Sequence, residues 1–169
     1  MDHRIALKPN TPLCLSNDSG EMIHCIIKNE IGRGGSCIVY EAVRITDTGD
    51  QTLYRIKEFY PYKLHISRNN NELVPSVHDM DSFQKGQKQF RCDFSHTNRL
   101  FYSGDNYSSM TNQLDVFNQN GTSYILSAYS SENTLAAYKP VNLKECITLI
   151  KQVVYVLGNI HKMGYLYLD

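Results

Sequence analysis

Gly32, Gly34 and Gly35 form the stretch of this chain whose residue types point most directly to chemistry. Glycine allows backbone conformations and close approaches that any Cβ would block, and successive N–H groups in such a turn can converge on an anion. Residues 22–31, before the glycines, alternate between apolar and polar side chains in the way that is typical of a half-buried strand. Residues 38–45 after them are expected to form a second strand. The sequence therefore predicts an anion-binding loop between two strands.

The surroundings of this loop exclude two common phosphate-binding motifs. No Gly-Lys-Ser/Thr ending is present, which excludes a Walker A loop, and no helix is expected next, which excludes the dinucleotide-binding fingerprint. A glycine loop between two antiparallel strands is the arrangement typical of protein kinases. Lys57 follows the loop by one strand and one turn, within a third strand expected at residues 51–59. A lysine at this point is suited to phosphate, because phosphoryl transfer depends mainly on positioning and charge neutralisation.

Residues 161–169 provide a third feature. They read His-Lys-Met-Gly-Tyr-Leu-Tyr-Leu-Asp and are similar to the end of a kinase helix that runs into the catalytic loop. With the glycine loop and Lys57 in this order, the chain resembles the eukaryotic-type protein kinase superfamily, and within it bacterial Ser/Thr protein kinase-like proteins. The resemblance implies an α+β fold: a kinase small lobe, with a five-stranded antiparallel sheet and one packing helix, followed by the first helices of the large lobe.

The resemblance divides the chain into three parts. These are an N-terminal extension with a possible short strand (residues 1–20), the small lobe (21–129), and the hinge exit with an incomplete start of the large lobe (130–169). The elements expected from local signals are a strand at 13–15 with a turn at 17–20, a helix that begins at Asp81-Ser82, strands at 112–117 and 122–129 joined by an Asn-Gly turn, and a long amphipathic helix from Asn142. Residues 62–80 are polar and irregular and are expected to form a loop.

The resemblance also implies roles for individual residues. The nucleotide would lie against Ile31, Gly32, Gly34, Gly35, Val39, Lys57 and the hinge residues Ala128 and Tyr129. Lys57 would bind the α- and β-phosphates, and Asp169 would be the catalytic base that accepts the proton of the substrate hydroxyl. The small Ser127, just before the hinge, would leave an open pocket behind the adenine. The expected cofactors are ATP and Mg²⁺, and the magnesium ligands are expected beyond the end of this chain, so no metal ligand is named.

Several positions depart from the kinase pattern. Cys37 replaces the usual third glycine, and Arg55 replaces the small residue that normally lies against adenine, where it would either hinder ATP or hold its head in solvent. The helix residue expected to pair with the nucleotide-binding lysine is Gln87 or Asp93, and a glutamine cannot form an ion pair. Leu168 replaces an arginine that reads phosphorylated activation loops, so activity is not expected to depend on such phosphorylation.

Charge and cysteine content exclude other classes of protein. Lys+Arg and Asp+Glu are equal at 17 each, so the chain lacks the basic excess expected of nucleic-acid or membrane-surface proteins. The five cysteines are scattered and odd in number, which predicts reduced thiols in a cytoplasmic protein and neither a zinc site nor a disulfide framework. No apolar stretch is long enough for a signal peptide or a membrane span.

The function expected from these features is transfer of the ATP γ-phosphate to a Ser or Thr hydroxyl of a protein substrate, in an intact protein of which this chain is the inactive N-terminal portion. The alternative is a pseudokinase, with the same fold used as a regulatory nucleotide-binding or scaffold module. A small-molecule kinase of the aminoglycoside or choline type is disfavoured, because those proteins usually lack a glycine loop of this form. A β-rich binding module outside the superfamily would leave the joint placement of Lys57 and Asp169 unexplained.

Overall fold

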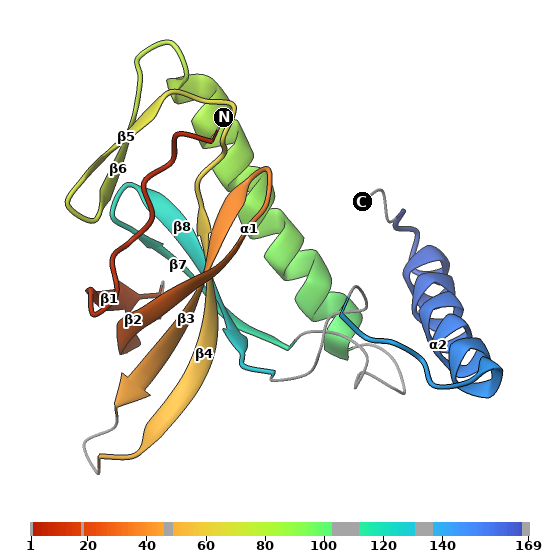
Figure 1. The fold of residues 1–169 in the computed structure, drawn as a ribbon. Coiled ribbons are helices and arrows are strands. Elements are labelled where there is room, and N and C mark those ends of the chain that lie inside the picture. The colour runs from red at the N-terminus through yellow and green to blue at the C-terminus, as the bar shows by residue number, and fades with distance from the viewer. Residues whose placement is uncertain (1, 18, 46–48, 103–111, 131–136, 167–169) are drawn as a thin grey trace.

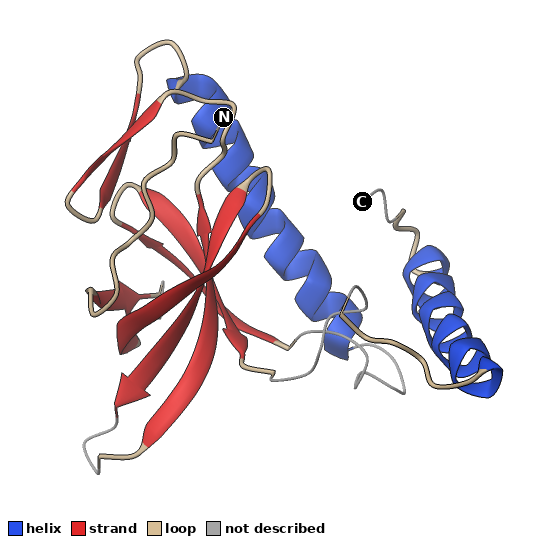
Figure 2. Ribbon diagram, in the orientation of Figure 1, coloured by secondary structure: helices blue, strands red, loops and turns tan. Residues whose placement is uncertain are grey.

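The computed structural model describes residues 2–17, 19–45, 49–102, 112–130 and 137–166 (Figure 1). The strands lie between residues 12 and 128, and one long helix interrupts them (Figure 2). The elements in chain order are β1 (Pro12–Ser16), β2 (Met22–Arg33), β3 (Cys37–Ile45), β4 (Gln51–Phe59), β5 (Ile66–Asn69), β6 (Glu72–Pro75), α1 (Met80–Tyr102), β7 (Gln113–Gln119), β8 (Thr122–Ala128) and α2 (Leu143–Lys162).

Six strands form one antiparallel sheet in the order β1-β2-β3-β4-β8-β7. The sheet curls so that its two edge strands, β1 and β7, meet. Two hydrogen bonds join these edges: the Ser16 N–H donates to Gln119 Oε1 at 3.3 Å, and Asn17 Nδ2 donates to Asp115 Oδ2 at 2.7 Å. The expected count of five strands is therefore wrong: the strand expected at residues 13–15 joins the same sheet as β1 and makes the sixth. Its addition to one edge lets the sheet close on itself.

The two faces of the sheet pack against different parts of the molecule. The inner face holds the main apolar core, to which every strand of the curled sheet contributes, and its largest fully buried side chains include Tyr40, Tyr60, Tyr124 and Phe117. The outer face carries α1. Phe59 of β4 packs there between Phe83 and Phe90, at ring-centroid distances of 5.3 and 5.4 Å. The helix comes close because a Cβ at Gly86 would lie 2.8 Å from Phe59 Cζ.

The hairpin of β5 and β6 is a second difference from expectation, since residues 62–80 were expected to form only a loop. Asn70 turns the chain with a φ of 55°, a conformation that asparagine tolerates better than most residues. The hairpin docks on the β7–β8 turn, where the Leu73 N–H donates to the Asn120 carbonyl at 2.9 Å. That turn has φ of 51° at Asn120 and 69° at Gly121, so the expected Asn-Gly turn is confirmed.

A buried ion pair joins the hairpin to the sheet. Glu58 is 0% exposed, and its carboxylate accepts from Tyr40 Oη at 2.9 Å, Tyr124 Oη at 3.0 Å and Arg68 Nη2 at 2.5 Å. Burial, then the adjacent Glu58 carboxylate, raises the pKa of both tyrosines well above the usual value. The sequence contains a signal for this buried carboxylate that was not interpreted as one. Glu58 alternates with Ile56 and Tyr60 and so belongs to an otherwise apolar face of the strand.

The helix expected from Asn142 is confirmed as α2, which lies apart from the sheet in Figure 1. Asn142 caps it, because its side chain accepts from the Glu145 N–H at 2.9 Å. Its apolar stripe stays largely in solvent, and Leu143, Ile147, Ile150, Val153 and Val154 are all exposed. It is the single helix described after the sheet, where several were expected. Within the described part of the chain, neither helix has the length and apolar character needed to cross a membrane.

Candidate functional site

One row of residues runs across four neighbouring strands of the sheet. Gly32 of β2 is in register with Val39 of β3, Val39 with Lys57 of β4, and Lys57 with Ile125 of β8. Residues directly opposite each other in antiparallel strands project to the same face. This row therefore brings the glycine loop, Val39 and Lys57 together on the outer face, although 25 positions separate Gly32 from Lys57 in the sequence (57 − 32).

The glycine loop joins β2 and β3, and the Gly34 N–H closes it by donating to the Cys37 carbonyl at 2.9 Å. The fold itself does not require its glycines. None of the three has a φ in the left-handed region, and a Cβ at Gly32 would meet nothing within 4 Å. At Gly34 and Gly35 a Cβ would make only ordinary contacts of 3.8 Å. Without side chains at these positions, the loop backbone is accessible to close approach by another group.

The structure also shows the exposure and strand pairing of Ile31 and Cys37, two further residues of the loop. Ile31 is 46% exposed at the end of β2, just before a register shift between Glu30 and Gly32. Cys37 is half-buried and pairs with Phe59 across β3 and β4, which puts it on the same face as Lys57. The Cys37 thiol, in place of a glycine, lies 3.8 Å from a Cβ built at Gly34, so it fits the loop without displacing the chain.

Lys57 is half-buried on the outer face, the face that also carries Phe59. Among the described residues, no carboxylate lies within 4 Å of its ammonium group. Gln87 lies on the sheet-facing side of α1, between Phe83 and Phe90 in the helical repeat, but it makes no hydrogen bond to Lys57. Asp93 is exposed and accepts from Gln89 Nε2 at 2.8 Å. In this arrangement Lys57 is a cation without an acidic partner in the described part of the chain.

Arg55 points toward the hinge instead of into solvent. Its Nη2 donates to the Ser130 carbonyl at 2.5 Å, and its guanidinium lies 5.6 Å from the centre of the Tyr129 ring. A second row on the same face includes Arg55. Here Arg55 is in register with Ser127, and Ser127 with Gln113. Arg55 Nε, Ser127 Oγ and Gln113 Oε1 are buried without a hydrogen-bond partner. This row is therefore polar and incompletely satisfied, which is unusual for a buried part of a sheet.

The expected hinge follows β8. The Ala128 N–H already donates to the Asn112 carbonyl at 2.9 Å, so this donor is in use. Tyr129 is 37% exposed beside Arg55. A planar base at this edge would therefore have to use the Tyr129 N–H and the carbonyl groups of the segment.

Two expectations cannot be followed into the structure. Asp169, the expected catalytic base, and Leu168 both lie outside the described residues. Within the described ranges, no group of three or more His, Cys, Asp or Glu side chains is arranged to hold a metal ion.

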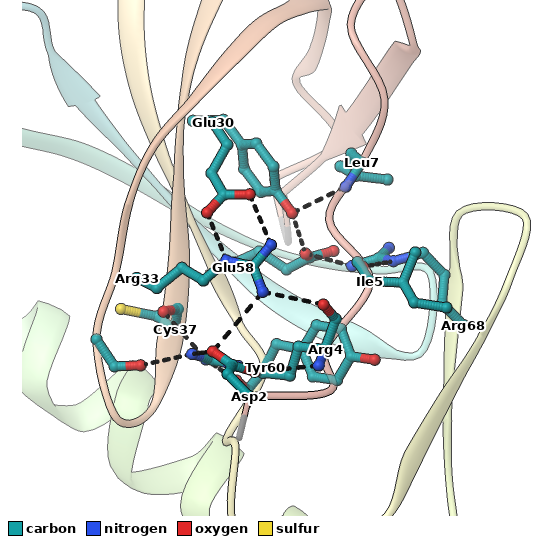
Figure 3. A network of polar contacts seen from close by, with 12 residues as sticks. Asp2, Arg4, Ile5, Leu7, Glu30, Arg33, Cys37, Glu58, Tyr60 and Arg68 are labelled. Carbon is teal, nitrogen blue, oxygen red and sulfur yellow. Dashed lines mark hydrogen bonds and ion pairs between the residues drawn. The ribbon is translucent and has the colours of Figure 1, made fainter.

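Sequence reasoning missed one residue at the loop, Arg4. Its guanidinium hydrogen-bonds three backbone carbonyls, two of which belong to the glycine loop (Figure 3). An arginine in a polar N-terminal segment carries no pattern of spacing or periodicity, so no sequence signal pointed to it.

Comparison with known proteins gives a similarity at the level of the solved structures. No protein-family model matches the chain, and no curated protein sequence matches it. Among solved structures, "PpkA-294 apo form", from a bacterial Ser/Thr kinase, matches with a TM-score of 0.68 and 26% sequence identity over 84% of this chain. The chain spans 50% of that structure, about half its length. The similarity supports a kinase-like fold for this chain.

Proposed function

We propose that the chain is the nucleotide-binding portion of a protein Ser/Thr kinase domain of the bacterial type, and that the intact protein transfers the ATP γ-phosphate to a protein hydroxyl. The observation that carries this proposal is the register of Gly32, Val39 and Lys57 across three adjacent strands. It brings together backbone that a phosphate can approach and a cation that has no acidic partner among the described residues. Both features suit the triphosphate of a nucleotide.

In this proposal each part of the row has a role. The loop backbone lies over the phosphates, Lys57 neutralises the α- and β-phosphate charge, and Val39 covers the base, while Ala128 and Tyr129 supply backbone groups to the edge of the base. Asp169 accepts the proton of the substrate hydroxyl. Because the described residues include no group of metal ligands, no step through Mg²⁺ is derived from them.

Specific observations favour the pseudokinase alternative. Gln87 occupies the sheet-facing side of α1 where an acidic partner for Lys57 would be expected, and Asp93 is engaged by Gln89. The guanidinium of Arg55 bonds the Ser130 carbonyl at the hinge, where it competes with a base for backbone acceptors. Both features leave nucleotide binding possible and weaken the case for phosphoryl transfer.

Nucleotide binding to the intact protein, measured by calorimetry and thermal shift with MgATP, is the first test. Replacing Lys57 by Met should lower the affinity roughly 10- to 100-fold, because a hydrogen bond to a charged group contributes about 1.5–3 kcal/mol. Lys85→Met, at an exposed position on α1, is the matched control and should bind as the wild type does. Equal affinity in the wild type and Lys57→Met would reject the proposed site.

Phosphate transfer to a protein substrate separates the two candidate functions. With radiolabelled ATP, an active kinase should label a Ser or Thr hydroxyl, and Asp169→Asn should abolish the labelling while nucleotide binding remains. Binding that depends on Lys57, without any transfer by the wild type, would favour the pseudokinase.

A further inference from the structure

An N-terminal segment, residues 2–7, lies against the glycine loop and is held there by its own contacts (Figure 3). Leu7 is buried in the inner core, and its N–H donates to Tyr40 Oη at 3.1 Å. The Ile5 carbonyl accepts from Arg68 Nε at 2.7 Å. Tyr40 and Arg68 are also the partners of the fully buried Glu58, so the segment is attached to a polar group at the centre of the fold.

Arg4 is the residue through which this segment reaches the loop. Its side chain is 5% exposed, and its Nη2 donates to the Gly34 carbonyl at 2.9 Å. Its Nη1 donates to the Cys37 carbonyl at 3.2 Å and to the Tyr60 carbonyl at 2.5 Å. One planar guanidinium therefore fixes both ends of the 34–37 turn relative to the end of β4. A lysine ammonium is a single point charge and cannot reproduce this fork.

Two acidic residues and a second arginine complete the contact. Asp2 accepts from Arg4 Nη2 at 2.6 Å, and this contact with Arg4 holds the pKa of the Asp2 carboxyl well below its usual range. Arg33, at the start of the loop, donates to the Arg4 carbonyl at 2.9 Å and pairs with Glu30 at 2.5 Å. The loop is thus bound both by the side chain and by the backbone of Arg4.

The segment lies on the face of the sheet opposite to Lys57. Leu7 shares the inner core with Ile38 and Tyr40, whereas Lys57 alternates with the buried Ile56 and Glu58 and projects to the outer face. The segment that carries Arg4 therefore packs from the side of the sheet opposite to Lys57.

From this geometry we infer that Arg4 is a positioning residue for the glycine loop. The N-terminal segment holds the 34–37 turn in one conformation and so reduces the ordering that the loop must undergo when phosphates bind. A loop that is already ordered loses less conformational entropy on binding, which raises affinity. The inference rests on the proposed function for its effect on nucleotide, but the restraint on the loop is independent of it.

Hydrogen exchange and nucleotide affinity of the intact protein test the inference, with Arg4→Ala, Arg4→Lys and the control Lys8→Ala, an exposed residue of the same N-terminal region. Arg4→Ala should speed amide exchange in residues 33–38 on the order of 10-fold, while exchange in β8 stays unchanged. Its affinity for MgATP should fall several-fold, and its affinity for adenosine, which lacks phosphates, should not. Arg4→Lys should fall between wild type and Arg4→Ala, and Lys8→Ala should match the wild type.

Unchanged exchange at residues 33–38 in Arg4→Ala would overturn the restraint. Faster exchange with unchanged MgATP affinity, or with equal losses for MgATP and adenosine, would overturn the positioning role. If the wild type binds no MgATP, the proposed function fails, and the exchange rates still decide whether Arg4 holds the loop. If Arg4→Ala unfolds the protein, which faster exchange in β8 would reveal, Arg4→Lys decides the outcome.

Discussion

Lys57 and Glu58 are neighbours on β4, but they lie on opposite faces of the sheet and in opposite situations. Glu58 is fully buried on the inner face, and three side chains of the same chain donate to its carboxylate. Lys57 is half-buried on the outer face, with no carboxylate of the described residues within 4 Å. One charge is paired within the fold, and the other has no acidic partner among the described residues.

Two hydroxyls on β8 repeat this contrast. Thr122 projects to the inner side, and its Oγ1 donates to the Phe59 carbonyl at 2.5 Å. Ser127 lies on the outer face in register with Arg55, and its Oγ is buried without a partner. Both residues are 1% exposed, so burial alone does not distinguish them. The difference lies in whether the chain supplies the hydrogen bond, and this separates polar residues that stabilise the fold from those that are available for function.

Removing Glu58 should have the largest effect on stability. Glu58→Ala leaves the Arg68 guanidinium, whose side chain is 3% exposed, buried without its counter-ion, which should lower the free energy of unfolding by about 3–5 kcal/mol. Lys57→Met should change it by less than about 1 kcal/mol, because the half-buried Lys57 has no ion-pair partner among the described residues to lose. Urea unfolding followed by circular dichroism measures both.

A paired replacement checks the cause of this loss. Glu58→Met combined with Arg68→Met removes both charges and should recover part of the stability, since a buried ion pair can be replaced by apolar residues of similar volume. A double variant as unstable as the sum of its two single variants would show that the two residues do not act as a pair.

Two glycines offer the next test, because one belongs to the fold and the other to the loop. Gly121 has a φ of 69°, and a Cβ there would lie 2.3 Å from the Leu73 carbonyl oxygen. Gly121→Ala should therefore lower the free energy of unfolding by about 1–3 kcal/mol and loosen the β5–β6 hairpin. Gly32→Ala meets open space and should leave stability nearly unchanged while it weakens MgATP binding.

Hydrogen exchange of residues 66–75 detects the loosened hairpin, and calorimetry detects the change at the loop. The reverse pattern, in which Gly32→Ala is the destabilising change, would mean that the loop glycine serves the fold and would remove one support of the proposed site.

The hydroxyls of β8 should respond with opposite signs. Ser127→Ala removes a buried hydroxyl that lacks a partner, so the free energy of unfolding should rise by about 0.5–1 kcal/mol. Thr122→Val removes a hydroxyl that is bonded to the Phe59 carbonyl and should lower it by about 1 kcal/mol. Thermal unfolding of the two variants beside the wild type measures this difference. A loss of stability in Ser127→Ala would show that its hydroxyl has a partner in solution.

Local signals predicted much of this fold. The glycine loop between two strands, the Asn120-Gly121 turn and the start of α2 near Asn142 each depend on residues that are close in the sequence, and all three form as expected. The β5–β6 hairpin was missed because its strands have four residues each and are held by distant partners, the Asn120 carbonyl and Glu58. The turn signal at Asn70 was present, but it had no periodic strand on either side.

The candidate site also contains residues that could be predicted from the sequence and contacts that could not. The kinase resemblance assigned Gly32, Val39 and Lys57 to one nucleotide site, and the register that aligns them across three strands came from the structure. The contact of Arg55 with the hinge and that of Arg4 with the loop join residues 75 and 30 positions apart, so no spacing in the sequence could indicate them. Such long-range contacts of single side chains depend on the final packing of the sheet.

Two cysteines give the smallest expected effect and the most direct comparison of the two faces. Burial in the inner core raises the pKa of the Cys25 thiol to about 11, so at pH 8 almost none of it is the reactive thiolate. Cys37 is half-buried at the loop on the outer face. Iodoacetamide at pH 8 should therefore modify Cys37 and leave Cys25 unmodified, as measured by peptide mass spectrometry.

The direction of the pH effect follows from the same shift. The pKa of a thiol in the unfolded chain is about 8.5, whereas the pKa of the folded Cys25 thiol is about 11. The unfolded state therefore loses its proton first as the pH rises. The Cys25 contribution to stability is therefore complete below about pH 8.5 and disappears as the pH approaches 11, and Cys25 should become reactive only in that range. MgATP should slow the modification of Cys37 and leave that of Cys25 unchanged, because only Cys37 belongs to the loop proposed to bind phosphate. Equal protection of both thiols would indicate a general stabilisation of the protein by the nucleotide and would remove the distinction between the two faces.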